Sequence, residues 1–115
     1  IRTNTPLQAL VTLNDPVYVE AARAMARRVV REAGSDVSDR IRYTVELALG
    51  HEPDSTTFHT LKTLHGQALR HYSENTHAAE KLMKSYSVAE MPTDSLAAQM
   101  VVSSAVMNLD EFVMH

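Results

Sequence analysis

The chain reads, at positions 95–107, Ser95-Leu96-Ala97-Ala98-Gln99-Met100-Val101-Val102-Ser103-Ser104-Ala105-Val106-Met107. The stretch carries no charge, and its apolar side chains would cover most of the circumference of a helix, which is typical of a helix buried on several sides. A membrane span needs roughly twenty apolar residues, whereas this run is shorter and is interrupted by Gln99, Ser103 and Ser104. We expect both serine hydroxyls to bond to carbonyls one turn back. The stretch therefore predicts the central helix of a bundle.

The preceding sequence repeats apolar side chains at three- and four-residue steps, the pattern of amphipathic helices. Prolines at positions 6 and 16 mark helix starts, and glycines at 34 and 50 mark helix ends. The expected helices cover residues 7–13, 16–33, 38–49, 56–72 and 76–86. Asp36 or Ser38, Asp54 or Ser55, and Asn75 or Thr76 are their expected N-caps. These features predict an all-α fold, a compact bundle of five or six helices with an apolar central C-terminal helix, in a single domain over residues 1–115.

Composition limits the kinds of site that the chain can hold. It has no cysteine, which excludes disulfides, thiolate metal sites, iron–sulfur clusters and covalent c-type haem attachment within this segment. The formal net charge is −3, with seven arginines up to position 42 and an acidic remainder. Nucleic-acid binding usually needs a concentrated basic face. We therefore expect no nucleic-acid partner and no membrane span.

Arginines line one face of the helix expected at residues 16–33. Glu20, Arg23, Arg27 and Arg31 follow one another at three- and four-residue steps. The favoured interpretation is a solvated face whose cations complement the negative end of the helix dipole. The alternative is a contact surface for an anionic partner or an acidic neighbouring domain, which makes Arg23, Arg27 and Arg31 candidate contact positions.

Asparagine and acidic residues recur at two expected helix ends. Asn14 precedes Asp15, and Asn108 is followed closely by Asp110 and Glu111. The favoured interpretation is that these side chains cap helices. The alternative is that the acids converge with Asn4 in a polar pocket for a metal or a sugar. These residues are further candidate polar positions.

Histidines recur every six residues, at His59, His65, His71 and His77. Six residues advance a helix by about 240° beyond one full turn, so successive histidines point to different faces. Metal-binding histidines on one helix normally lie three or four residues apart. We expect solvated or partly packed histidines, no metal site and, since no serine lies in a nucleophile-elbow sequence, no catalytic residue.

The opening Thr3-Asn4-Thr5-Pro6-Leu7-Gln8-Ala9-Leu10, with Leu13-Asn14-Asp15-Pro16 and Val19-Glu20-Ala21-Ala22 behind it, resembles a planctomycete domain-of-unknown-function family of PSD type. Two later segments resemble the same family, namely Ala48-Leu49-Gly50 with Pro53, and Asn108-Leu109-Asp110-Glu111-Phe112. The chain departs from the family at His51, where a basic residue is common, and at Gln99, where an aromatic one is common. The resemblance implies the C-terminal fragment of a large extracytoplasmic or periplasmic protein that also carries cytochrome-c-like domains. Any haem would then lie elsewhere in the parent protein, with no cofactor in this segment.

The expected function is non-catalytic, that of a structural or protein-interaction domain. Its expected partners are the upstream domains of the same polypeptide, and a homodimer of the isolated segment is a further expectation. One alternative is a carbohydrate-binding module, although the chain has few aromatic side chains and no tryptophan for stacking on sugar rings. Another alternative is a part of an enzyme whose catalytic groups lie upstream of Ile1.

Overall fold

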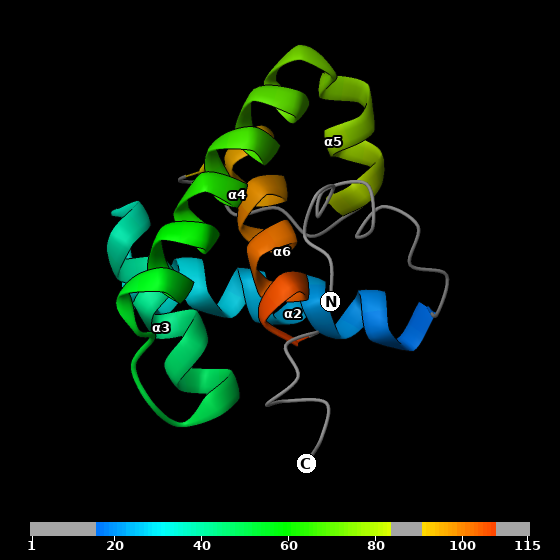
Figure 1. Cartoon of the computed structure of the whole chain (residues 1–115). Helices are drawn as coiled ribbons and strands as arrows, with labels where there is room; N and C mark the ends of the chain where they lie inside the picture. The colour runs from blue at the N-terminus through cyan, green and yellow to red at the C-terminus, as the bar shows by residue number, and fades with distance from the viewer. Residues whose placement is uncertain (1–15, 84–90, 108–115) are drawn as a thin grey trace.

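Five helices and no strand make up the regular structure of the residues that the computed structural model describes, 16–83 and 91–107 (Figure 1). The helices are α2 (Pro16–Ala33), α3 (Val37–Leu49), α4 (Ser55–Glu74), α5 (Thr76–Met83) and α6 (Thr93–Met107). The all-α prediction is confirmed. The helix expected at 7–13 lies outside the described residues, as does the part of the expected fifth helix beyond 83.

Local sequence signals set most of the helix ends. Gly34 and Gly50 adopt left-handed conformations, with φ of 89° and 82°, as expected of glycines that end helices. The side chain of Asp36 accepts a hydrogen bond from the Asp39 amide at 3.0 Å, and that of Asp54 accepts one from the Thr57 amide at 2.8 Å. The aspartate, and not the serine, is therefore the N-cap of both α3 and α4.

Two glycines provide a matched test of this backbone requirement. Gly50→Ala is expected to destabilise the chain by about 1 kcal/mol, because a left-handed conformation strains any residue that has a Cβ atom. Gly66→Ala, inside α4 with nothing within 4 Å of an added Cβ, is expected to stabilise by up to about 1 kcal/mol. Thermal unfolding of the two variants should shift the midpoint in opposite directions, and shifts of the same sign would contradict this account.

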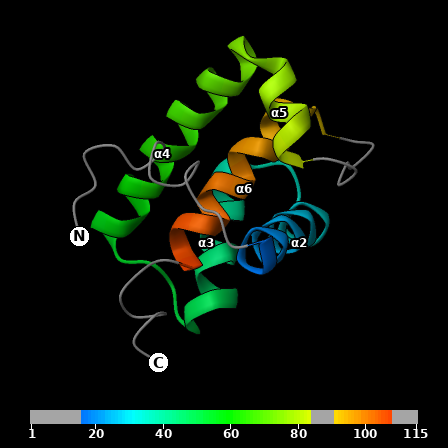
Figure 2. The same ribbon diagram turned by 90° about the vertical axis from the view of Figure 1, so that its right-hand side faces the viewer.

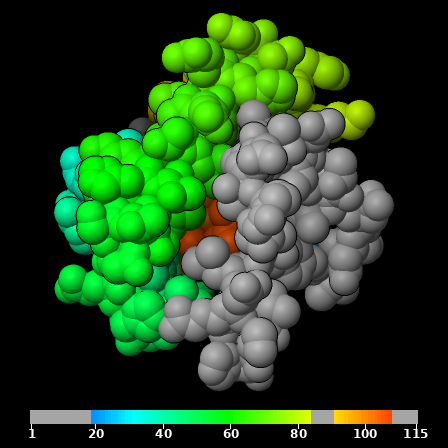
Figure 3. Space-filling model, viewed as in Figure 1, coloured from blue at the N-terminus to red at the C-terminus, as the bar shows by residue number. Residues whose placement is uncertain are grey.

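Helix α6 contacts each of the other four described helices, and Figures 1 and 2 show it between α2 and α4. Most of its residues are buried, and in the space-filling view only a small part of it is seen beside α4 (Figure 3). It begins at Thr93, two residues earlier than predicted, and so includes Asp94. The Asp94 side chain accepts hydrogen bonds from the Ser95 amide and, at 2.7 Å, from the Ser73 hydroxyl of α4.

The buried apolar side chains form two clusters that both include α6. The large apolar cluster joins α2, α4 and α5 to α6, through residues such as Ala26, Ala68 and Leu96. The small apolar cluster joins α3 and the first turns of α4 to the end of α6, and consists of Ile41, Val45, Leu61, Val102 and Val106. In these clusters α3 contributes two buried apolar side chains, Ile41 and Val45, whereas α2 contributes three, Ala22, Ala26 and Val30.

Two sequence-based expectations about polar side chains are wrong. Arg23 does not share the solvated face of α2, because it is only 7% exposed and its Nε donates a hydrogen bond to the Leu82 carbonyl at the end of α5. His65 was expected to be solvated or partly packed, but it is fully packed, because it is 4% exposed and lies next to Leu64 on the inward stripe of α4. The Ser103 hydroxyl, which was expected to bond to a carbonyl one turn back, accepts a hydrogen bond from the Gln99 amide nitrogen.

None of the helices in the described ranges combines the length and the hydropathy that crossing a membrane requires.

Candidate functional site

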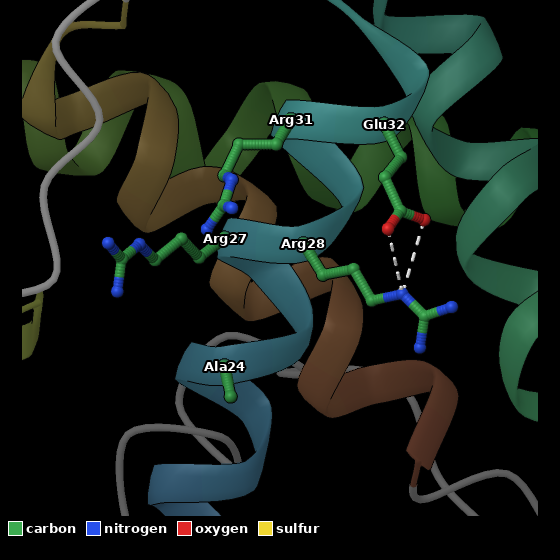
Figure 4. A pocket seen from close by; sticks show the side chains of 5 residues that line it. All are labelled: Ala24, Arg27, Arg28, Arg31 and Glu32. Atoms are coloured by element: carbon green, nitrogen blue, oxygen red, sulfur yellow. Dashed lines mark hydrogen bonds and ion pairs between the residues drawn. The ribbon is translucent and has the colours of Figure 1, made fainter.

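Three exposed arginines lie on the C-terminal half of α2, at positions 27, 28 and 31; together they are called the arginine surface. They line an open depression of about 540 Å³ along the helix, together with Ala24 and Glu32. Figure 4 shows Arg27 and Arg31 on one side of α2 and Arg28 on the other, directed toward Glu32. The structure thus brings together two of the three arginines predicted as contact positions, Arg27 and Arg31.

Arg28 is engaged within the chain. Its Nε donates to both carboxylate oxygens of Glu32, at 3.1 and 3.2 Å, and the Tyr43 hydroxyl of α3 donates to the same carboxylate. The hydrogen bond from Tyr43, followed by that from Arg28, holds the pKa of Glu32 below its ordinary value. The bond to Glu32 in turn raises the pKa of Tyr43. The guanidinium groups of Arg27 and Arg31 lie on the other side of the helix from that of Arg28.

A second group of polar side chains is buried between helices and is called the polar cluster. All of its members are at most 4% exposed: Arg40 and Thr44 of α3, His65 of α4, and Gln99 and Ser103 of α6. The Arg40 Nη1 atom donates to the carbonyls of Gly34 and Ser35, at 3.4 and 2.7 Å, in the turn between α2 and α3. Its Nε donates to Gln99 Oε1 at 3.3 Å, and its Nη2 lies 3.4 Å from His65 Nε2. One guanidinium group therefore connects the α2–α3 turn with α4 and α6.

The donor-only character of arginine fixes the direction of every bond in the polar cluster. A guanidinium group has no acceptor atom, so His65 Nε2 must carry a lone pair and the neutral ring has its proton on Nδ1. For the same reason Gln99 turns its oxygen toward Arg40. The Gln99 amide nitrogen then donates to Thr44 Oγ1 at 3.0 Å and to Ser103 Oγ at 3.3 Å. The Thr44 hydroxyl donates to the Arg40 carbonyl at 2.7 Å, which closes the network.

Burial controls the electrostatics of the polar cluster. Loss of water lowers the pKa of Arg40, and the charge of Asp36 opposes that change in part. Burial, followed by the nearby positive charge of Arg40, lowers the pKa of His65 to about 4. In the described part of the chain no carboxylate forms an ion pair with Arg40. The carbonyl, amide and imidazole dipoles around the guanidinium group therefore replace its hydration.

The remaining candidate positions are not among the residues that the structure describes. They are Asn4, Asn14, Asp15, Asn108, Asp110 and Glu111. Within residues 16–83 and 91–107 no group of three or more histidine, cysteine, aspartate or glutamate side chains could hold a metal ion.

The sequence-based analysis did not single out Arg40, and it predicted Gln99 to be interior without naming partners for it. A signal was present in the spacing. Arg40 and Thr44 stand beside Ile41 and Val45 on the inward stripe of α3. The spacing favours burial of a polar residue on such a stripe, and a buried polar residue needs a hydrogen-bond partner.

Comparison with known proteins identifies a matching family. The model of a family named PSD1, described as a protein of unknown function (DUF1553), matches residues 1–65. These residues include α2, α3 and the first half of α4, and so contain Arg40 and His65. The resemblance drawn from the opening of the sequence is confirmed, whereas the segment 108–112 that was also quoted for it lies beyond the matched residues. No curated protein and no solved structure matches the chain.

Proposed function

The chain belongs to the PSD1 family of proteins of unknown function (DUF1553), and we propose that it is a non-catalytic interaction domain in which Arg27 and Arg31 of the arginine surface bind an acidic surface of another domain. The observation that carries the proposal is the position of Arg27 and Arg31. Both are exposed and lie one helical turn apart on the same side of α2. Residues at this spacing are neighbours about 6 Å apart, and like charges there repel each other. A partner carboxylate between them would offset this repulsion.

The chemistry of the arginine surface favours carboxylates as its ligands. A guanidinium group presents a planar fork of donors that matches the two oxygens of a carboxylate. Glu32 already binds Arg28 from within the chain, where the Arg28 Nε atom donates to both carboxylate oxygens. A partner carboxylate would bind Arg27 and Arg31 through the same pair of chemical groups on the other side of the helix.

The proposed partner is an upstream domain of the same polypeptide. This part of the proposal rests on the resemblance described above, which implies a large extracytoplasmic parent protein with cytochrome-c-like domains. Redox chemistry and haem would then belong to the other domains, and this chain would hold no cofactor. Its contribution would be to fix their relative positions.

Charge reversal on α2 tests the proposal. The double variant Arg27→Glu/Arg31→Glu is expected to weaken binding of the chain to the separately produced segment that precedes Ile1 in the parent polypeptide. Loss of two charge-assisted contacts and their replacement by repulsion predicts a decrease of about a hundredfold or more in affinity. Isothermal titration calorimetry at two salt concentrations measures it, and the affinity of the unaltered chain should fall as salt rises.

Arg28→Gln is the matched control. It removes one positive charge from the same helix, but this charge is already paired with Glu32, so the affinity is expected to change by about threefold or less. Equal losses in the two variants would indicate a general charge effect, and unchanged binding of the double variant would exclude the arginine surface as the contact.

A further inference from the structure

We propose that the polar cluster is an acid-operated lock, in which a proton on His65 Nε2 breaks the connection to Arg40 and releases α3 from α4 and α6. The proposal concerns the stability of the fold and does not depend on the function proposed for the arginine surface.

The proposed effect of acid follows from the hydrogen-bond acceptors around the Arg40 guanidinium group. Its Nη2 atom faces His65 Nε2 at 3.4 Å, and only an unprotonated nitrogen can accept there. A proton on Nε2 turns the acceptor into a donor, so that two N–H groups face each other. It also places a second positive charge beside a guanidinium group that is 2% exposed, where water cannot screen the repulsion.

Among residues 16–83 and 91–107 no hydrogen-bonded neighbour compensates the new charge. The group of α3 that faces His65 is the Arg40 cation, and the polar-cluster members on α6, Gln99 and Ser103, are neutral. Asp36 acts on Arg40 through its charge, but among the described residues no carboxylate bonds to the His65 ring. Separation of α3 from α4 would relieve the repulsion between the protonated ring and Arg40.

Helix α3 is the element that separates because it depends most on the polar cluster. Its buried residues are Arg40, Ile41, Thr44 and Val45, and two of these four belong to the polar cluster. By contrast, α4 contributes only His65 to it and is otherwise held by Leu61, Leu64, Ala68 and Tyr72. Release of α3 would also separate Tyr43 from Glu32 on α2, since the hydrogen bond between them joins the two helices.

The direction of the pH effect follows from the pKa of His65. This pKa is lowered from 6.5 to about 4 in the folded chain, so the unfolded chain binds the proton more readily between these two values. The contribution of His65 to stability is therefore complete above about pH 6.5 and is lost as the pH falls toward 4.

Nuclear magnetic resonance of the unaltered chain, with ¹⁵N-labelled histidine, is the first test. At neutral pH the His65 ring should carry its proton on Nδ1, and it should titrate with a midpoint below about pH 5. Amide protection in residues 37–49 should be lost together with this titration, before protection in α6 is lost. A proton on Nε2 at neutral pH, a midpoint near that of a free histidine, or equal loss of protection in all helices would overturn the proposal.

The variant His65→Gln is the second test, because its side-chain oxygen can accept from Arg40 but does not titrate in this range. Opening of α3 should then begin about one pH unit lower than in the unaltered chain. The matched control is His59→Gln, which removes an exposed histidine of the same helix and should keep the original acid profile. An unchanged profile in His65→Gln would overturn the lock, and if that variant does not fold, the titration of the unaltered chain still decides the question.

Discussion

Gln99→Leu is expected to lower the free energy of unfolding by about 2–4 kcal/mol, although it places an apolar side chain in a fully buried position. Gln99 is 0% exposed, and its oxygen accepts from Arg40 Nε. Removal of that acceptor leaves a buried charged group short of one hydrogen bond, which costs more than the loss of a neutral pair. Urea unfolding at pH 7 measures the change.

The double variant Arg40→Met/Gln99→Leu distinguishes this explanation from a simple loss of packing. When both the charge and its acceptor are replaced by apolar groups, no buried polar partner remains between them, and such replacements are often close to neutral. The double variant should therefore be less destabilised than the sum of the two single variants by at least about 1 kcal/mol. Additive losses would show that Arg40 and Gln99 contribute independently, and would contradict the network described above.

Leu96→Ala should lower the free energy of unfolding by about 2–5 kcal/mol, the range for a large side chain removed from a core. Leu96 lies on α6, is 1% exposed, and belongs to the large apolar cluster that joins α2, α4 and α5. The shortened side chain would leave a cavity at the point where these helices meet. Thermal and urea unfolding of the same variant provide the measurement.

Leu47→Ala is the matched control for Leu96→Ala, since it deletes the same atoms from a half-buried position on α3. Its expected cost is about 1 kcal/mol, because less apolar surface returns to water and solvent fills the space. Equal destabilisation by the two alanine variants would contradict the conclusion that α6 packs at the centre of the large apolar cluster.

The sequence predicted those parts of the fold that depend on local chemistry. The bounds of α2 follow from Pro16 and Gly34, which act through their own backbone conformations. For the N-caps of α3 and α4 the sequence offered an aspartate or a serine, and the aspartates are the residues that bond to amides three residues ahead. The burial of residues 96–107 follows from their composition. None of these predictions requires knowledge of a second helix.

Long-range partners could not be predicted in this manner. Whether Arg23 faces water or the interior depends on the Leu82 carbonyl, 59 residues away in sequence. Its long side chain sits at the border of the apolar face, where either direction is compatible with the helical pattern. The spacing of Arg40 placed it inward while its residue type indicated the surface, and only the positions of Gln99 and His65 resolve that conflict.

The structure also shows what the residues of the family match pack against. It covers residues 1–65, but both apolar clusters are completed by α6, at residues 93–107. The matched residues contain Arg40 and His65 but not Gln99 or Ser103. In this chain the residues that the family model matches therefore depend for their packing on α6, which lies outside the match.

The place of α6 in the order of the chain determines how the described residues can fold. Every helix that α6 contacts precedes it, so both apolar clusters stay incomplete until the last turn of α6, near residue 107, has been synthesised. Helix α3 has 13 residues and α5 has eight, and isolated helices of such lengths are only marginally stable in water. Until α6 has been synthesised, the apolar side chains that α2–α5 contribute to the two clusters lack their packing partner on α6, and they are open to aggregation or to a chaperone.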